Sequence, residues 1–340
     1  MLDLPIKANW MIAAMGLLLY YKHAETRPEI SKKLFWGVII SFIVIPYLYA
    51  DSFEGASYLV AFLTVYIIST GSITPRTIRL TGLSIAAMGL VVLYIYATGT
   101  MLSGWNDNAI AMVGLFSFIY FSIFLIEKKG KRSFWIWNTV TLAYILLLFG
   151  TDCRSGMLFT MITVAGIIFS SLAKRLIENS RYEMLILNLP LIIAFIVIAI
   201  SSSSYYDELE MWSIQKFDKT IFNGRNGLWE YALTLLEQSS YLGTGKFEIN
   251  YHNSGVAAIS VFGILGYICW IGYFSRSLKN LKKFMRDDIV FGSILAFSLI
   301  FMQQALDLGF ISPVPNLLPY IILGVGIGRV NQLKKEECNP

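Results

Sequence analysis

Two arginines and one histidine carry the chemistry that this sequence could perform. Arg154 lies in the run Asp-Cys-Arg-Ser-Gly, and Arg225 lies in Gly-Arg-Asn-Gly-Leu-Trp. A guanidinium is planar and always charged, so two of them could hold a phosphate or pyrophosphate. His252 is one of only two histidines and could act as a general base on a sugar hydroxyl. Together they suffice to neutralise an anionic group and to remove one proton.

Each of these residues also has an ordinary alternative role. Both arginines could be interfacial residues, with Arg154 bridged to Asp152. His252 could bond a backbone carbonyl at the membrane surface. Glu248, four residues earlier, could orient the imidazole if that segment is helical. Types and spacing alone leave these alternatives open.

Further residues near Arg225 and His252 are candidates for substrate contacts. Trp229 lies four residues after Arg225 and shares its helical face, where it could stack on a sugar or anchor the helix. Gly243 and Gly245 form a Gly-Thr-Gly link that permits a turn or a tight approach. A lone Gly-x-Gly does not define a phosphate loop.

Composition decides the class of protein. Hydrophobic residues make up 56% of the chain and charged residues 14%, and the mean hydropathy is +0.62. Soluble domains have about 25% charged residues. Apolar runs of about 17–25 residues recur, each long enough to cross a membrane. We expect an all-α, polytopic transmembrane helical bundle in which residues 1–340 form a single integral membrane domain.

Eleven spans are predicted, and two of them contain a proline that should kink the helix, Pro46 and Pro190. The spans are 6–21, 34–50, 56–73, 80–98, 109–126, 134–150, 156–172, 185–201, 254–274, 289–306 and 315–328.

Orientation follows from the basic residues. With these spans, 21 of the 27 Lys and Arg residues fall on one side, which is therefore cytoplasmic. The N-terminus is then outside and the C-terminus cytoplasmic, as an odd number of spans requires. Arg154, Arg225 and His252 all fall on the extracytoplasmic face.

One connection, 202–253, is a long extracytoplasmic loop that we expect to pack on the membrane domain, because about 50 residues rarely fold alone. Within it, Asn223 could cap an amphipathic helix over 225–237. Its predicted apolar stripe comprises Leu228, Ala232, Leu235 and Leu236.

Two absences narrow the function. Topology separates Cys153, Cys269 and Cys338, so no disulfide is expected, and no metal-ligand spacing occurs. The spans carry almost no ionisable residues, which argues against a proton-driven transporter.

The order Cys-Arg-Ser-Gly, Gly-Arg-Asn-Gly-Leu-Trp, Gly-Thr-Gly, His-Asn-Ser and Gly-Ile-Leu-Gly resembles the O-antigen polymerase and O-antigen ligase superfamily. The resemblance covers 151–270 by motif and the remainder by topology. It implies a GT-C-like membrane glycosyltransferase that uses polyprenyl-linked sugars and needs no metal, cofactor or nucleotide sugar. By similarity, Arg154 and Arg225 would hold the pyrophosphate of an undecaprenyl-pyrophosphate glycan, and His252 would activate the acceptor hydroxyl.

The resemblance implies a polymerase of O-antigen, capsule or exopolysaccharide in the bacterial inner membrane. The alternatives are an O-antigen ligase acting on lipid A-core, a lipid-glycan flippase and a structural scaffold. Expected partners are the lipid-linked oligosaccharide, membrane lipid, a flippase and a chain-length regulator, with no nucleic acid. The expected substrate-binding residues are Ser155, Asn226, Trp229, Gly243, Gly245 and Asn253.

Overall fold

A computed structural model describes residues 32–71, 74–99, 107–126, 131–151, 153–218, 220–306, 310–313 and 315–338. These residues form helices joined by turns and short irregular segments, and no strand occurs among them. The predicted all-helical fold is confirmed for this part of the chain. The first predicted span, 6–21, lies outside the described residues.

The helices have the following bounds in chain order: α2 (Lys32–Ile39), the π-helix η1 (Ile40–Val44), α3 (Ile45–Ala50), the 3-10 helix η2 (Glu54–Ala56), α4 (Ser57–Thr70), α5 (Pro75–Ala97), α6 (Asp107–Ile126), α7 (Lys131–Phe149), α8 (Arg154–Ile168), α9 (Ser170–Glu178), α10 (Tyr182–Ser201), α11 (Tyr206–Phe217), α12 (Arg225–Gln238), α13 (Ser254–Lys282), α14 (Asp288–Gln303) and α15 (Leu318–Cys338).

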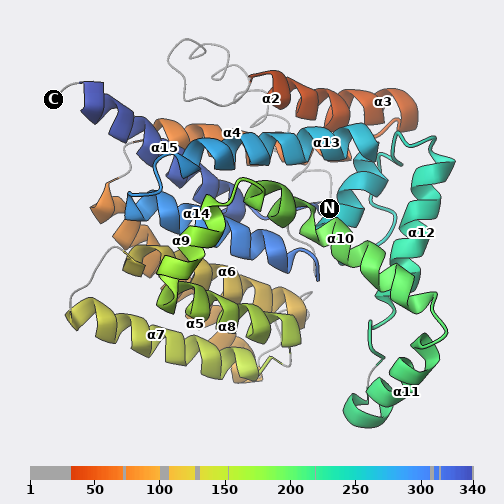
Figure 1. The fold of residues 1–340 in the computed structure, drawn as a ribbon, viewed down its shortest axis with the longest axis horizontal. Coiled ribbons are helices and arrows are strands. Elements are labelled where there is room, and N and C mark those ends of the chain that lie inside the picture. Colours follow the sequence, from red (N-terminus) through yellow and green to blue (C-terminus); the bar gives the residue numbers. More distant parts are fainter. Residues whose placement is uncertain are drawn as a thin grey trace.

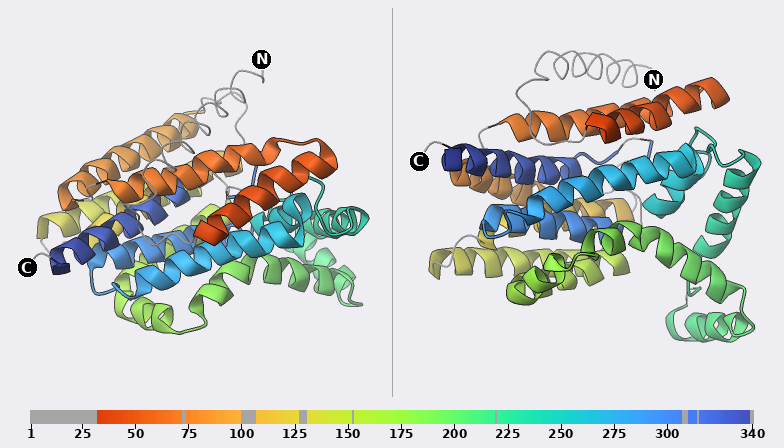
Figure 2. Two further views of the ribbon diagram at one scale, coloured as in Figure 1. Left: turned by 90° about the horizontal axis from the view of Figure 1, so that it is seen from above. Right: turned by 45° about the horizontal axis from the view of Figure 1, so that its top comes forward.

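The helices form a bundle with two distinct ends (Figure 1). Helices α11 and α12 lie at one end, here the loop end, and the C-terminus lies at the other, here the tail end. Both views in Figure 2 show the same separation. Helix α14 is central, since all but a few of its side chains are buried against α13, α15, α6 and α10. The other helices therefore surround α14, which forms the centre of the bundle.

The outer helices expose large apolar side chains. Leu48 is 76% exposed, Trp135 67% and Leu146 65%, and they lie on α3 and α7. Soluble monomers rarely expose wide apolar surfaces. A hydrocarbon surrounding accounts for them without a further partner.

Four helices of the described part are long and apolar enough to cross a membrane, namely Lys33–Ala50, Leu80–Ala97, Tyr182–Ser201 and Ser254–Lys282. A fifth arises if α8 and α9 count as one span. Shorter apolar helices accompany them at Glu54–Thr70, Asn108–Ser122, Phe134–Phe149 and Asp288–Gln303. Their length and composition are those of helices in a membrane protein.

The predicted span 156–172 is not one straight helix. The chain bends by 93° between α8 and α9, at Phe169. After the bend, Ile177 is buried while Arg175 is exposed. The bend lets the amphipathic α9 bury Ile177 against the bundle, while Leu172 and Leu176 stay exposed with the charged residues.

The two prolines act in different ways. Pro46 follows the π-helix η1, because a helix that lacks one N–H must rearrange the preceding turn. Pro190 remains inside α10, and its carbonyl oxygen accepts a hydrogen bond from the side chain of Asn253 at 2.8 Å. A neighbouring helix thus stabilises the second proline site.

Ion pairs join three segments at the tail end. Lys282 lies 3.0 Å from the buried carboxylate of Glu183. Arg329 contacts Asp287 through both Nε and a terminal nitrogen at 2.9 Å. The predicted spans leave the connections 173–184 and 275–288 and the tail 329–340 on one side of the membrane, and these ion pairs join residues of the same three segments.

Hydrogen bonds join a different set of segments at the loop end. Ser52 donates its hydroxyl to the carbonyl oxygen of Gly245 at 2.6 Å, and the N–H of Phe247 donates to the carboxylate of Glu54 at 2.7 Å. The turn between α3 and α4 therefore supports the link that follows α12.

Candidate functional site

Helix α12 is fastened to the segment that precedes His252. Trp229 in α12 is 1% exposed, and its indole N–H donates to the carbonyl oxygen of Tyr251 at 2.7 Å. A buried indole needs such a partner. Tyr251 is itself fully buried, and this burial raises the pKa of its phenol. The enclosed ring of Trp229 favours the anchoring role over stacking on a sugar.

Arg225 and Asn226 form the first turn of α12, and both are half-buried. The helix starts after Gly224, which has a left-handed φ of 74°, and no side chain caps it. The predicted cap by Asn223 is wrong, since that residue is also left-handed with φ 54° and its side chain does not accept from the helix. The amide nitrogen of Asn226 lies 3.5 Å from the hydroxyl of Tyr206.

Tyr206 belongs to α11, a helix that sequence reasoning missed. The ring of Tyr206 stacks on that of Phe222, with the ring centroids 6.1 Å apart. The carboxylate of Glu210, also in α11, accepts a hydrogen bond from the N–H of Ile221 at 3.0 Å. Desolvation and then the charge of Glu210 raise the pKa of Tyr206. α11 therefore contacts the segment 221–222, which leads into Arg225.

Helix α13 is broken about a third of the way along its length, at Gly263. Gly263 has φ 71° and ψ −178°, a conformation outside the helical region that glycine tolerates best. The break frees backbone groups that a membrane helix would otherwise satisfy itself. The N–H of Ile264 donates instead to the carbonyl oxygen of Tyr241 at 3.2 Å.

The Gly-Thr-Gly link fits into this break. The N–H of Thr244 donates to the carbonyl oxygen of Ser260 at 2.9 Å, and the N–H of Gly245 donates to that of Val261 at 2.8 Å. A Cβ on Gly243 would lie 2.4 Å from the backbone nitrogen at the break. Both glycines make a tight approach to protein: Gly243 approaches the backbone at Gly263, and a Cβ on Gly245 would lie 3.0 Å from Cβ of Ala50 and 3.1 Å from Cβ of Pro46.

Asn253 holds the start of α13 with every atom of its amide. The side-chain oxygen accepts from the N–H groups of Gly255 and Val256 at 2.8 and 3.0 Å. The side-chain nitrogen donates to the carbonyl oxygens of Pro190 and Ala305 at 2.8 and 3.1 Å. The residue is 0% exposed. Its position is that of a structural junction between α10, α13 and the end of α14.

A polar network that sequence reasoning missed continues from Asn253. The hydroxyl of Ser254 donates to the side-chain oxygen of Gln304 at 2.8 Å, and the Gln304 amide donates to that of Gln303 at 2.6 Å. The N–H of Phe310 also donates to Gln304, at 2.9 Å. All three polar side chains are buried. The sequence feature that could have predicted this network is the pair of adjacent glutamines, Gln303 and Gln304, at the end of an apolar run.

His252 lies between two fixed residues and is half-buried. Tyr251 before it is held by Trp229, and Asn253 after it caps α13. Its φ of 48° is left-handed, which is uncommon for a residue with a side chain. The segment containing Glu248 is not helical, so the helical spacing proposed to orient the imidazole does not exist.

Arg154 and Ser155 stand on a different part of the bundle. They begin α8, which packs on α6 and α14, whereas α12 packs on α13 and α10. Arg154 is exposed, and the hydroxyl of Ser155 lies 3.3 Å from the sulfur of Cys153. Asp152, the alternative partner of Arg154, lies outside the described residues.

The structure therefore gathers most, but not all, of the predicted site. Trp229, Gly243, Gly245 and Asn253 belong to one packed assembly, and it carries Arg225 and half-buried His252 on its backbone. α8 begins at the same loop end of the bundle (Figure 1). Arg154 and Ser155 are the predicted site residues that lie outside this assembly, because α8 packs on α6 and α14.

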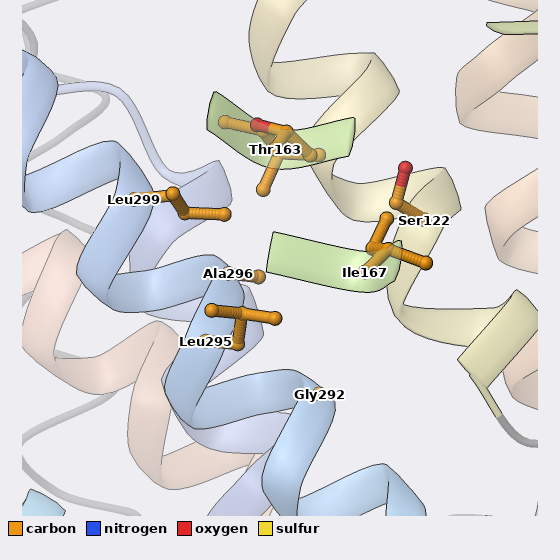
Figure 3. A pocket seen from close by; sticks show the side chains of 8 residues that line it. Ser122, Thr163, Ile167, Gly292, Leu295, Ala296 and Leu299 are labelled. Carbon is orange, nitrogen blue, oxygen red and sulfur yellow. The ribbon is translucent and has the colours of Figure 1, made fainter. Parts of the chain in front are cut away.

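A small hollow lies between α6, α8 and α14 (Figure 3). Its lining is apolar apart from the hydroxyls of Ser122 and Thr163. Thr163 is about two and a half helical turns beyond Arg154. The hollow offers no charged group and is separate from the assembly around His252.

No protein-family model matches the chain, and neither a curated protein nor a solved structure matches it.

Proposed function

We propose that this chain is a membrane-embedded polysaccharide polymerase. It transfers a glycan from undecaprenyl pyrophosphate to the sugar of another lipid-linked repeat unit. The observation that supports this most is the hydrogen bond from Trp229 to Tyr251, which joins the helix of Arg225 to the backbone beside His252. An anion-binding side chain and a potential base are thereby carried by one rigid assembly.

The proposal includes about eleven spans in a GT-C-like arrangement in a bacterial inner membrane. The tail end is cytoplasmic and the loop end extracytoplasmic, with the N-terminus outside. Two contacts support this orientation. The Lys282–Glu183 ion pair joins two segments proposed to be cytoplasmic, and the hydrogen bond from Ser52 to Gly245 joins two segments proposed to be extracytoplasmic. The basic tail end agrees with the charge rule for cytoplasmic loops.

The reaction needs one bond made, one broken and one proton moved. An acceptor hydroxyl oxygen forms a bond to the anomeric carbon of the donor glycan. The bond from that carbon to the pyrophosphate breaks, and its electron pair leaves with the phosphate. His252 takes the hydroxyl proton, which contributes about 10²–10⁴-fold. Arg225 neutralises the charge that develops on the leaving group.

Arg154 enters this proposal as a second guanidinium. Its place at the first residue of α8, at the loop end, puts it on the proposed extracytoplasmic face. A long lipid-linked substrate could bridge α8 and α12. The proposal requires that Arg154 and Arg225 contact the same pyrophosphate when substrate is bound.

The decisive experiment uses purified full-length protein with lipid-linked repeat units alone. We expect a ladder of polymers, lost in His252→Ala and in Arg225→Lys, since lysine lacks the planar fork. Lys216→Ala is the matched control, because Lys216 is an exposed basic residue of the same loop. A wild-type preparation that makes no ladder contradicts the polymerase.

The first alternative is an O-antigen ligase. It predicts that product appears only when lipid A-core or another acceptor is added to the same assay. A flippase predicts movement of lipid-linked glycan across vesicles without new glycosidic bonds. A scaffold predicts that all three substitutions, including Arg154→Ala, leave polymer formation in cells unchanged.

A further inference from the structure

A second candidate site lies at the tail end, between α13 and α15. Four lining residues of this hollow are polar: Ser277 and Asn280 from α13, and Asn331 and Lys334 from α15. Asn280 is 9% exposed. Asn331 donates one amide hydrogen to the carbonyl oxygen of Ser69 on α4 at 3.1 Å, which fixes this wall to a third helix.

Lys334 gives the hollow a positive charge. Its ammonium nitrogen lies 5.7 Å from the centre of the Phe284 ring, a cation–π contact that places the charge beside the end of α13. None of the described lining residues is acidic. The amides of Asn280 and Asn331 are donors as well as acceptors. This combination favours an anion over a cation.

The remaining wall is apolar and comprises Leu281, Ile327 and Val330. Lysines become frequent at this end of α13, where Lys279 and Lys282 lie in the last turn of the helix. Headgroups of a bilayer lie where hydrocarbon gives way to water. A ligand here would meet donors and a cation on one side and apolar side chains on the other.

We propose that this hollow binds the phosphate of an anionic phospholipid headgroup. The phosphate oxygens accept hydrogen bonds from Lys334, Asn280 and Asn331, and the first carbons of the lipid contact Leu281 and Ile327. A basic pocket between membrane helices suits such headgroups. Free phosphate would use only the polar half of the hollow. The proposal is independent of glycan transfer.

Native mass spectrometry of the purified full chain tests this. Phosphatidylglycerol and phosphatidylcholine with identical acyl chains are titrated into wild type, Lys334→Gln and Lys335→Gln. Lys335 is the matched control, because it is the exposed neighbour with the same charge. We expect one tightly held phosphatidylglycerol, weakened about fivefold by loss of one lysine at the membrane surface, in Lys334→Gln alone.

Three results would overturn the proposal. Equal weakening by both lysine substitutions would mean a diffuse positive surface rather than a site. Equal retention of phosphatidylcholine would mean that the anionic headgroup is not recognised. Displacement of the lipid by inorganic phosphate at similar concentration would mean that the acyl portion contributes nothing. Retained phosphatidylglycerol with loss only in Lys334→Gln supports it.

Discussion

Trp229 donates its indole hydrogen to the carbonyl oxygen of Tyr251 at 2.7 Å, with both residues buried. Because His252 follows directly, this bond fixes the proposed base relative to α12. Trp229→Phe keeps most of the ring but leaves a buried carbonyl without its donor, which costs about 1–3 kcal/mol. We expect a lower Tm in detergent and a reduced polymerisation rate. Trp135→Phe, at a position on α7 that is 67% exposed, should leave the Tm unchanged.

The glycines at the break of α13 should be intolerant of a methyl group. Gly243→Ala and Gly263→Ala each place a Cβ within about 2.5 Å of backbone atoms and force a positive φ on alanine. Both should unfold the assembly or lower yield severely. Gly227→Ala is the control, since nothing lies within 4 Å of its Cβ position. It should be neutral or stabilise α12 by up to about 1 kcal/mol. Equal behaviour of all three variants in thermal unfolding would refute the break.

Asn253 should be needed for its donors as well as for its cap. Asn253→Asp keeps a cap acceptor but loses the N–H groups that reach Pro190 and Ala305. We expect Asn253→Asp and Asn253→Ala both to lower thermal stability, by about 1–3 kcal/mol for each buried group left unpaired. Asn223→Gly, at an exposed position that caps nothing and whose left-handed φ of 54° glycine tolerates, should change it little. Full stability of Asn253→Asp would show that only the cap matters.

The Glu183–Lys282 pair should be sensitive to removal of one partner. Lys282→Met leaves a carboxylate that is 2% exposed without its cation, which costs about 3–5 kcal/mol for a buried pair. Adding Glu183→Leu should restore much of this loss. Lys174→Met is the control, because the Lys174–Asp288 pair is more than a third exposed and contributes about 0–1 kcal/mol. Unfolding in denaturant measures all three.

Alkaline pH should weaken the loop end through Tyr251. Burial raises the pKa of its phenol above the ordinary value of 10.0 in the folded state. Above that ordinary value the unfolded chain loses the proton while the folded chain keeps it, so stability falls as pH rises. Below it this contribution is complete. In Tyr251→Phe, the fall in Tm above pH 10 should be smaller than in wild type.

Helix formation and the presence of apolar helices were predictable, because the length of an apolar run is a local property of the sequence. α10 follows its predicted span 185–201 closely, whereas α13 begins at the predicted residue 254 but is broken at Gly263 and continues to Lys282, eight residues past the predicted end at 274. The bend at Phe169 was not predicted, because the run stays apolar through it. Only the amphipathic pattern after Ser170 distinguishes the two pieces.

The sequence located residues that the structure brings together, but it did not reveal what their side chains contact. Gly243, Asn253 and Trp229 carry signals that suit a ligand, yet each one is used to join pieces of backbone. A sequence shows that a small or polar residue is present, but its partner lies far along the chain. Pro190 and Ala305, which Asn253 contacts, are 63 and 52 residues away.

The gap at Gly263 has a consequence for the loop before it. The carbonyl oxygens of Ser260 and Val261 accept hydrogen bonds from the N–H groups of Thr244 and Gly245. These two donors precede α13 in the chain, so they are synthesised first. A hydrocarbon environment would leave those oxygens bare if the link were absent. The loop is therefore an internal component of the inserted fold, and it cannot be exchanged as a cassette between homologous chains without the helix that it completes.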